Sequence, residues 1–521
     1  MRRSNLLGLA VPLAAAIPAP TEPAAAVVAN VANVECQPTA APELSGRGIV
    51  DDVKSYGEDV KSYVGSLASD VASDVASFVN SGILDFPSGF PIGSAVESAL
   101  GVSSGDLDAV PTQVLNLPAY ANWTDEGWNV RVHGNVYKVP NISESKVDDL
   151  ADVFLVGTSV DDLDGAGKAQ ARNVTRSIFV VQQGDESVSV TFEDNAQVKP
   201  DVDGGAVAAK GGAQSFKLPY NTTVEGDFDT FVTLRNTSGA DGSHLIPGNA
   251  TSRVQVLNSE INGTSSGNAS VYLVPDEGLT VVSDIDDILR VTKIYQPDEG
   301  LLNTFARPFR PWMNMPDVYA NWSASLPDLH FHYLTTTPEQ VTRNYMDFVY
   351  KTYPPGSFDT RPLNFSDVDA TLSIRQFLLE KVFDTFPARK FVLVADTSNP
   401  DVMKDYPGLY NSRPDQVQCI LLRNTSATDD KDRFPYNTKA FKDIPKEKYM
   451  FFLVPDDLAG LDIKNGQCLN SSIPQNVTFD TQGLPFGLGD DDSGTGHAHV
   501  TSGWASVFIT TFTIILIGAV L

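Results

Sequence analysis

Short apolar runs separated by helix-like spacings mark the second half of the chain. The runs are rich in β-branched and aromatic residues, which is typical of buried strands. Residues 373–386 place apolar side chains at intervals of three and four, which predicts an amphipathic helix between two of the runs. This alternation predicts an α/β domain with a doubly wound parallel sheet. The expected strands are residues 278–284, 330–338, 390–396, 417–422 and 449–454.

Polar residues follow three of these runs at the point where each run ends. In an open α/β sheet, ligands bind beyond the carboxyl ends of the strands, so these side chains are expected to converge. Carboxylates packed together repel one another unless a cation or hydrogen-bond donors lie among them. A polar turn would explain the polar residues at any one strand end. Polar residues at the ends of three strands favour a functional site. The residues are Asp284, Asp286 and Asp287 after the first run, Thr335 to Thr337 in the second, and Asp396 and Asp401 after the third.

The first half of the chain has a different pattern. From about residue 115 to 273, alternating segments such as 128–137 and 187–192 lie between Gly- and Asn-rich turns, which predicts a β-sandwich-like domain. Before it, residues 46–86 repeat apolar positions at three and four and predict an amphipathic helix. The polar side of this helix is mostly acidic, so we expect it to pack on the protein body rather than on an anionic membrane. Residues 20–45 are rich in Ala, Pro and Val and predict a linker.

Four segments of the second half form an ordered set: Val282–Asp287, His332–Pro338, Tyr353–Phe358 with Arg361–Leu363, and Phe386–Asp396. Together they make residues 275–460 resemble the fungal actin-patch phosphatidate phosphatase family of the haloacid dehalogenase superfamily. The Asp-x-Asp-Asp element gains its specificity from its order with the Tyr-Pro-x-Gly-Ser-Phe segment. The resemblance implies a haloacid-dehalogenase-like phosphatase domain preceded by a β-rich region.

The resemblance also implies a division of roles in phosphoric monoester hydrolysis. Asp284 would attack phosphorus and form an aspartyl-phosphate, which splits the reaction into two easier steps. Asp286 would protonate the leaving alkoxide and then take a proton from the attacking water. Thr335 would donate a hydrogen bond to a phosphoryl oxygen. Mg²⁺ would be held among Asp284, Asp286, Asp396 and Asp401, with one main-chain carbonyl among its ligands, and would offset the repulsion between nucleophile and phosphate.

Three positions depart from the family pattern. Ile288 stands where Thr is usual, and Ala395 replaces the usual Gly before Asp396. The superfamily expects a Lys near the start of the helix before the last motif, whereas this chain has Arg375 there and Lys381 farther along. Arg balances phosphate charge, but its planar fork does not occupy the same point as an ammonium group. The sequence therefore leaves Arg375 and Lys381 as alternatives for the catalytic cation, and a degenerate site as a third possibility.

Length, net charge and cysteine content limit the possible number of domains, partners and disulfides of this chain. A chain of 521 residues is long enough for two to four domains. Its formal net charge of −28 argues against nucleic acid as a partner, because the two would repel each other. Only three cysteines occur, so the chain is not a disulfide scaffold. Cys419 and Cys468 could pair in an oxidising compartment, which would leave Cys36 as the odd one.

Both ends of the chain predict export. Residues 1–19 combine a basic start, a short apolar core and small residues, as secretory signal peptides do. Residues 504–521 form an uncharged apolar tail after a polar stalk with small residues at 475–503. This arrangement predicts a glycolipid anchor, with a C-terminal transmembrane helix as the alternative. The expected location is the extracellular face of the plasma membrane or the cell wall.

Glycosylation motifs support export independently of the termini. Each is an Asn-x-Ser/Thr triplet without proline, and many such motifs in a secreted chain predict N-linked glycans. They lie at Asn122, Asn141, Asn173, Asn221, Asn236, Asn249, Asn262, Asn268, Asn321, Asn364, Asn424, Asn470 and Asn476.

Two hypotheses follow. The first is a secreted, surface-anchored, Mg²⁺-dependent phosphatase whose implied substrate is phosphatidic acid or another phosphomonoester. The second is a catalytically impaired cell-surface or cell-wall binding protein on the same fold. The segment Gly263–Gly267 matches a serine-hydrolase pattern, but its turn-like surroundings argue against that chemistry. His330 and His332 alternate with apolar residues, and we expect them to be core histidines more than site residues.

Overall fold

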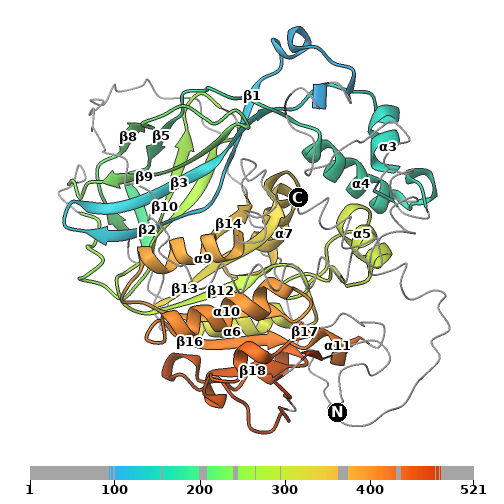
Figure 1. Cartoon of the computed structure of the whole chain (residues 1–521). Helices are drawn as coiled ribbons and strands as arrows, with labels where there is room; N and C mark the ends of the chain where they lie inside the picture. The colour runs from blue at the N-terminus through green and yellow to red at the C-terminus, as the bar shows by residue number, and fades with distance from the viewer. Residues whose placement is uncertain are drawn as a thin grey trace, which may run out of the picture.

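Two large sheets pack against each other in the computed structural model (Figure 1). The structure describes residues 93–482 apart from 94–95, 98–99, 153, 156–157, 199–207, 239–243, 265, 294, 362–373, 430–435, 476 and 480. The expected signal peptide, linker, N-terminal amphipathic helix and C-terminal tail lie outside the described residues. Among the helices that the structure describes, none combines the length and the apolar character needed to cross a membrane.

A six-stranded parallel sheet forms the second half of the chain, as the alternating pattern predicts. Its order is β14-β13-β12-β15-β16-β18, so the first strand in sequence lies in the middle. Every residue of β12 is buried, as expected for a strand covered on both faces. The strands are β12 (Leu279–Asp284), β13 (Leu329–Pro338), β14 (Ser357–Arg361), β15 (Lys390–Asp396), β16 (Val417–Arg423) and β18 (Tyr449–Phe452).

Helices cover both faces of this sheet, which confirms the doubly wound arrangement. Alternate residues of β12 belong to different apolar clusters, with Val281 on one face and Val282 on the other. The cluster around Val281 includes α6 (Met315–Ser325) and α7 (Glu339–Thr352). The cluster around Val282 includes α9 (Ile374–Thr385) and α10 (Pro400–Ser412). The shorter helices α5 (Pro297–Phe305) and α11 (Thr425–Thr428) follow β12 and β16.

The N-terminal sheet contains eleven strands and follows the path β1-β3-β2-β11-β10-β5-β8, with β4, β6, β7 and β9 off that path. Its hydrogen bonds join all of these described strands into one sheet. Two further strands, β17 (Tyr436–Asn437) and β19 (Thr481–Gln482), pair with each other. The strands are β1 (Thr112–Asn116), β2 (Ala119–Thr124), β3 (Gly127–Lys138), β4 (Val181–Gln182), β5 (Ser189–Phe192), β6 (Asn195–Val198), β7 (Ala208–Lys210), β8 (Gln214–Lys217), β9 (Asp227–Leu234), β10 (Gln255–Ile261) and β11 (Asn268–Leu273).

Two helices interrupt this β-rich region and were not expected from its alternating pattern. They are α3 (Glu144–Asp152) and α4 (Gly165–Ile178). Asp164 caps α4, because its side chain accepts a hydrogen bond from the Gly167 main-chain N–H. Both helices add apolar side chains to the cluster that contains α6 and α7. The N-terminal region and the parallel sheet therefore share a core.

The two sheets also contact each other directly. The Phe358 main-chain N–H in β14 donates to the Pro118 carbonyl oxygen at 2.9 Å. Tyr120 of β2 packs edge-on against Phe386, and its ring centroid lies 5.6 Å from that ring. Cys419 and Cys468 form a disulfide that joins β16 to the C-terminal segment, as one of the sequence alternatives proposed. Figure 1 shows α9 on the side of the parallel sheet that faces the N-terminal sheet.

Candidate active site

The order in which the chain adds strands to the sheet reverses at β12, which makes the carboxyl end of that strand a topological switch point. The order β14-β13-β12 runs outward on one side, and β15-β16-β18 continues on the other. Such a switch point is where open α/β sheets bind ligands. Asp284 is the last residue of β12 and pairs with Leu334 of β13. Asp396 ends β15, the strand on the other side of β12.

Asp284 is a buried carboxylate with an arginine beside it. Its side chain is 4% exposed, and its Oδ1 accepts a hydrogen bond from the Ile285 main-chain N–H at 2.8 Å. Arg375 Nη2 lies 2.9 Å from Asp284 Oδ2. Burial raises the pKa of Asp284 to about 6, although the Arg375 charge opposes that rise. The pair therefore keeps a substantial fraction of Asp284 ionised near neutral pH.

Arg375 occupies the first turn of α9 and is 1% exposed. Within the part of the chain that the structure describes, its Nε and Nη1 atoms have no hydrogen-bond partner. Two buried donors next to a carboxylate are suited to an anion that brings its own oxygen atoms. Lys381, the alternative cation, points elsewhere, because its Nζ lies 2.6 Å from Asp229 Oδ2 in the N-terminal sheet. The geometry thus favours Arg375 over Lys381.

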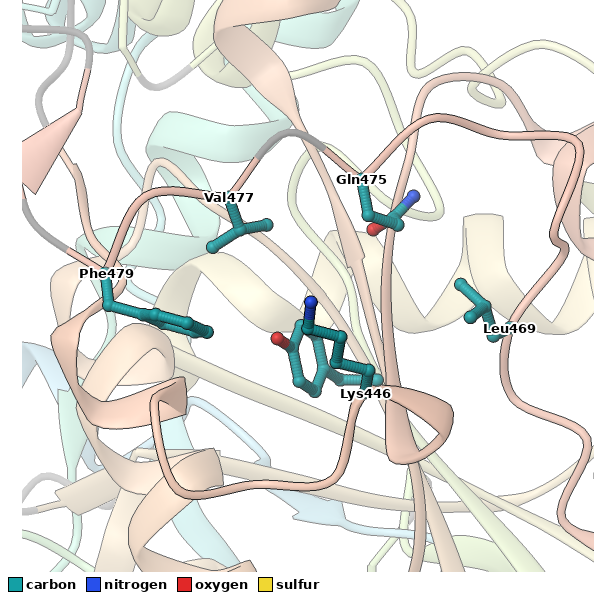
Figure 2. Close-up of a pocket in the computed structure, with 6 residues that line it drawn as sticks. Lys446, Leu469, Gln475, Val477 and Phe479 are labelled. Carbon is teal, nitrogen blue, oxygen red and sulfur yellow. The ribbon is translucent and has the colours of Figure 1, made fainter.

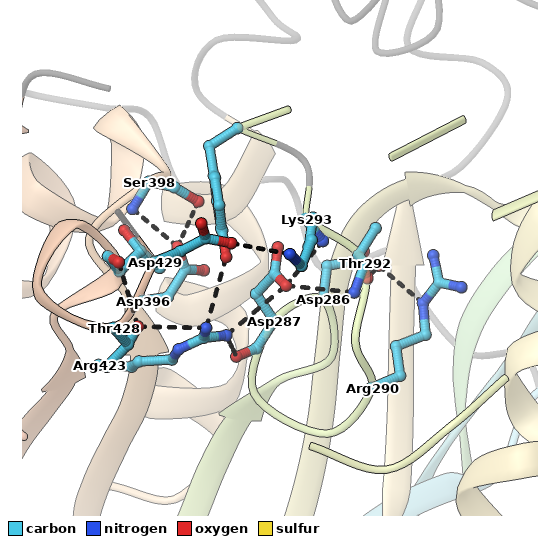
Figure 3. Close-up of polar contacts among 12 residues, drawn as sticks. Asp286, Asp287, Arg290, Thr292, Lys293, Asp396, Ser398, Arg423, Thr428 and Asp429 are labelled. Atoms are coloured by element: carbon cyan, nitrogen blue, oxygen red, sulfur yellow. Dashed lines mark hydrogen bonds and ion pairs between the residues drawn. The ribbon is translucent and has the colours of Figure 1, made fainter. Parts of the chain in front are cut away.

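Three side-chain donors hold Asp286 in place. Its Oδ1 accepts hydrogen bonds from Arg290 Nε at 2.9 Å and from Thr292 Oγ1 at 2.7 Å (Figure 3). Thr337 Oγ1 lies 3.3 Å from Asp286 Oδ2. Arg290 is fully buried and also donates to the Tyr345 hydroxyl at 2.6 Å. These contacts fix the orientation of the Asp286 carboxylate.

Asp287 closes the loop after β12 and has a left-handed backbone with φ of 57°. Its Oδ1 accepts the main-chain N–H groups of Thr292 and Lys293 at 3.1 and 2.8 Å. Arg423 Nη1, from the end of β16, donates to the Asp287 carbonyl oxygen at 2.6 Å. Arg423 also lies over the Trp312 ring, 4.2 Å from its centroid. Backbone strain of this kind persists where surrounding contacts enforce it, and it is frequent at functional sites.

Asp396 lies within the electrostatic reach of the acids that follow β12. Its Oδ1 accepts the Ser398 main-chain N–H at 2.7 Å. Burial, followed by the charges of Asp287 and Asp284, raises the pKa of Asp396 to about 8. These three carboxylates therefore repel one another in the absence of a cation.

Asp401 lies in the first turn of α10, on the Arg375 side of the site. Burial raises its pKa to about 6, while the charges of Arg375 and Lys404 oppose that rise. Its main-chain N–H donates to the capping side chain of Asn399 at 3.1 Å. Asp401 therefore lies within the electrostatic reach of Arg375.

Thr335 lies one residue beyond the Asp284 partner in β13 and is 1% exposed. Its Oγ1 accepts the Thr337 main-chain N–H at 3.1 Å. The hydroxyl proton of Thr335 can therefore be donated to another acceptor.

The carboxylates at the ends of β12 and β15 are oxygen ligands of the kind that Mg²⁺ binds. Mg²⁺ prefers oxygen ligands, keeps several waters and is often bound by only one or two carboxylates. Asp284 and Asp396 provide such a pair, and their mutual repulsion would be relieved by a cation. Across the described ranges there is no group of three or more His, Cys, Asp or Glu side chains arranged to hold a metal. The residues thus fit a water-rich magnesium site and do not fit an all-protein cage.

Sequence reasoning named Thr337 among the strand-end residues but missed Arg290, Thr292 and Arg423 as site residues. Arg290 was visible four positions after Asp286, a spacing typical of an ion pair within one turn. Arg423 ends a predicted strand and so shares the carboxyl edge with Asp284. Thr292 gave no distinct signal, because hydroxyl residues are common in loops.

Two other features do not belong to this site. His330 and His332 are buried and both contact Ser357 Oγ, at 3.1 and 2.8 Å, which makes them core residues. A small hollow of about 60 Å³ lies near the amino end of β18, opposite the edge that carries Asp284, and Figure 2 shows the residues that line it. Its lining residues are Lys446, Tyr449, Leu469, Gln475, Val477 and Phe479. Gln475 there bonds the Phe451 main chain and so covers the edge of the sheet.

Comparison with known proteins identifies the parallel-sheet region. Residues 279–424 match the family model described as phosphatidate phosphatase APP1, catalytic domain. The comparison with curated proteins found no match. Among solved structures, a family two carbohydrate esterase from Cellvibrio japonicus is 10% identical over 60% of this chain and 86% of that chain, with a TM-score of 0.16. That value carries no argument about fold or function.

Proposed function

Residues 279–424 belong to the phosphatidate phosphatase APP1 catalytic-domain family, whose members are phosphoric monoester hydrolases, and from this we propose that Asp284 is the nucleophile of an active phosphatase. The observation that carries the proposal is the contact of 2.9 Å between Arg375 Nη2 and Asp284 Oδ2 at the switch point. A carboxylate next to two unpartnered arginine nitrogens can receive a phosphoryl group and neutralise its charge. We infer a haloacid-dehalogenase-like catalytic domain from the family match together with the Arg375–Asp284 contact at the switch point.

The proposed reaction has two steps. In the first, Asp284 attacks phosphorus while Asp286 delivers a proton to the leaving alkoxide. In the second, Asp286 removes a proton from water, which attacks the aspartyl-phosphate and releases inorganic phosphate. Arg290, Thr292 and Thr337 hold the Asp286 carboxylate so that it reaches the leaving oxygen in the first step and the attacking water in the second. Arg375 and the Thr335 hydroxyl donate to the phosphoryl oxygens as charge develops on them.

Asp284 and Asp396 would hold Mg²⁺ directly, with Asp286 contributing from its main chain, and Asp401 would act through a bound water, because no three acidic side chains of the described residues are arranged around one metal position. When bound, the ion would supply charge neutralisation between the anionic nucleophile and the phosphate. The structural support is the position of Asp284 and Asp396 at the ends of the neighbouring strands β12 and β15, where the charges of Asp287 and Asp284 help to raise the pKa of Asp396. Arg423 keeps the loop of Asp287 in the conformation that brings these acids together.

We propose phosphatidic acid as the substrate, with diacylglycerol as the product. The support for a lipid is the family of residues 279–424. A soluble phosphomonoester is the alternative substrate, because the proposed roles of the site residues involve contacts with the phosphate group alone.

Secretion and surface anchoring are part of the proposal. The disulfide between Cys419 and Cys468 fits an oxidising compartment. Several glycosylation motifs carry an exposed Asn and are accessible for modification. These are Asn141, Asn173, Asn221, Asn249, Asn262, Asn268 and Asn321. A mass shift after glycosidase treatment and release from cells by phospholipase C would test the glycans and the lipid anchor.

The decisive experiment measures phosphate release from phosphatidic acid in detergent micelles and from a soluble phosphomonoester. The full chain secreted without residues 504–521 is compared with Asp284→Asn, with and without Mg²⁺. Asp347→Asn is the matched control, because Asp347 is an acid on α7 whose side chain is 80% exposed. Activity that needs Mg²⁺ and is lost only in Asp284→Asn supports the proposal. Equal release by the Asp284→Asn variant and the unsubstituted protein would contradict it.

A further inference from the structure

We propose that the N-terminal sheet positions the catalytic Arg375. It does so by binding helix α9 through an ion pair between Asp229 and Lys381. This inference rests on the proposed role of Arg375 in phosphoryl transfer. It makes Asp229, a residue outside the family match, a positioning residue for the phosphatase site.

The ion pair is short and its acidic partner is rigidly held. Lys381 Nζ lies 2.6 Å from Asp229 Oδ2. Arg131 binds the same carboxylate in a bidentate manner, with Nε 2.9 Å from Oδ1 and Nη2 2.9 Å from Oδ2. A fork of this kind fixes the direction of a carboxylate as well as its position. Lys381 therefore meets a preoriented partner.

Arg131 connects this pair to the parallel sheet. Its Nη1 donates to both carboxylate oxygens of Asp359 in β14 at 2.7 Å. Arg131 and Asp359 are 2% and 0% exposed, so water does not screen this contact. His133 and His332 also reach Asp359, at 3.2 and 3.3 Å. Asp229 is thus tied to the same scaffold that carries the active-site strands.

Arg375 and Lys381 use different faces of α9. They are six residues apart, which corresponds to about 9 Å along the helix and about 240° around it. The buried side chains of α9 are mostly apolar, through Ile374, Leu378, Leu379, Val382 and Phe383. Two other polar contacts lie at its C-terminal end, where Arg413 Nη2 lies 2.6 Å from the half-exposed Asp384 carboxylate and Gln416 Nε2 donates to the Phe383 carbonyl oxygen at 3.1 Å. Lys381 is nearer to Arg375 in sequence and adds a directional contact to the N-terminal sheet, whereas apolar burial is non-directional. The ion pair at Lys381 therefore helps to set the helix position that brings Arg375 to Asp284.

Small errors in this position matter for catalysis. A displacement of about 1 Å can cost on the order of a hundredfold in rate when a group must meet a developing charge. Loss of the pair should therefore reduce kcat through Arg375 while leaving the protein folded.

The experiment uses the full secreted chain with Asp229→Asn and Lys381→Met. Lys351→Met is the control, because it removes a lysine from an exposed pair with Asp347 on α7. Hydrogen exchange of peptides covering α9 is measured alongside kcat and KM for the soluble phosphomonoester. We expect faster exchange in α9, kcat lower by about tenfold and nearly unchanged KM in both variants. Lys381→Arg should retain most of the activity.

A double-mutant cycle distinguishes an effect of Asp229 on the position of Arg375 from a general destabilisation of the protein. If Asp229 acts through Arg375, adding Asp229→Asn to Arg375→Lys should cause little further loss of kcat. Additive losses, or α9 exchange unchanged in Asp229→Asn, would overturn the inference while the proposed function stands. If the unsubstituted protein releases no phosphate, the proposed function fails instead. In that case the exchange of α9 alone decides whether the ion pair holds the helix.

Discussion

Arg290 Nε donates to Asp286 Oδ1 at 2.9 Å from a fully buried position, so the proposed general acid is paired with a cation that water does not reach. The guanidinium also lies 4.0 Å from the centroid of the Tyr345 ring and 4.6 Å from that of Phe309. These aromatic rings hold Arg290 in one orientation. The orientation of Asp286 therefore depends on packing that begins in α5 to α7 and not only on the loop after β12.

Replacing Arg290 by Met should lower kcat by about a hundredfold, because Asp286 loses its charged donor and its fixed direction. Steady-state kinetics with a soluble phosphomonoester measures the effect. Arg307→Met is the matched control, since Arg307 pairs with Glu299 at 40% exposure for both side chains. Equal losses in the two variants would show that the orientation of Asp286 does not matter.

The choice between the two candidate cations gives a second prediction. Arg375→Met should reduce kcat by about a hundredfold or more, because both the pair with Asp284 and the phosphoryl donors are removed. Arg375→Lys should retain more activity than Arg375→Met, since it keeps the charge but loses the fork. Full activity in Arg375→Met would return the role to Lys381 or to another cation.

The disulfide supplies a third prediction. Removing it through Cys419→Ala together with Cys468→Ala opens a loop closed across a sequence separation of 49 residues. The free energy of unfolding should fall by about 2–4 kcal/mol. Denaturant unfolding measures this fall, and Cys36→Ala serves as control because Cys36 is not part of that bridge. An unchanged midpoint in the double variant would refute a stabilising role.

The fold of the parallel sheet could be predicted because each strand is buried on both faces. Its apolar runs are then continuous and easily recognised, as β12 and β15 show. The helices α3 and α4 were missed for the opposite reason. Their apolar positions are few and lie within a region of alternating segments, and their burial depends on contacts with α5 and α7 that no local pattern reveals.

The family motif segments pointed to the candidate site, yet several residues of these segments stabilise the fold instead of contributing to the site. Gly356 is required by packing, because a Cβ there would lie 2.3 Å from the Phe331 carbonyl oxygen. Arg389 donates to the carbonyl oxygens of Pro275 and Leu279 at 2.8 and 2.7 Å and fixes the start of β12. The order of strand-end acids predicted that Asp284 and Asp396 lie at the same edge of the sheet, and the structure places them at the ends of neighbouring strands. It could not identify Arg423 or the Lys381–Asp229 pair, because these contacts join segments far apart in the chain.

The buried acids predict a dependence of stability on pH. In the unfolded chain Asp side chains lose their protons near pH 4. In the folded chain burial raises the pKa of Asp284 to about 6, and burial with the charges of Asp287 and Asp284 raises that of Asp396 to about 8. Between about pH 4 and 8 the folded, metal-free protein therefore binds more protons than the unfolded chain. Its free energy of unfolding should fall as pH rises through this window.

Thermal unfolding in EDTA at pH 5, 6, 7 and 8 measures this fall. Asp396→Asn should reduce the slope above pH 6, because one group that titrates there is removed while Asp405, whose pKa burial also raises to about 8, remains. Asp347→Asn should leave the slope unchanged. Adding Mg²⁺ should stabilise the unsubstituted protein more at pH 8 than at pH 5, since a cation favours the ionised carboxylates. An equally steep fall in Asp396→Asn would show that other groups cause the pH dependence. Stabilisation by Mg²⁺ that is the same with and without Asp396 would remove that residue from the proposed metal site.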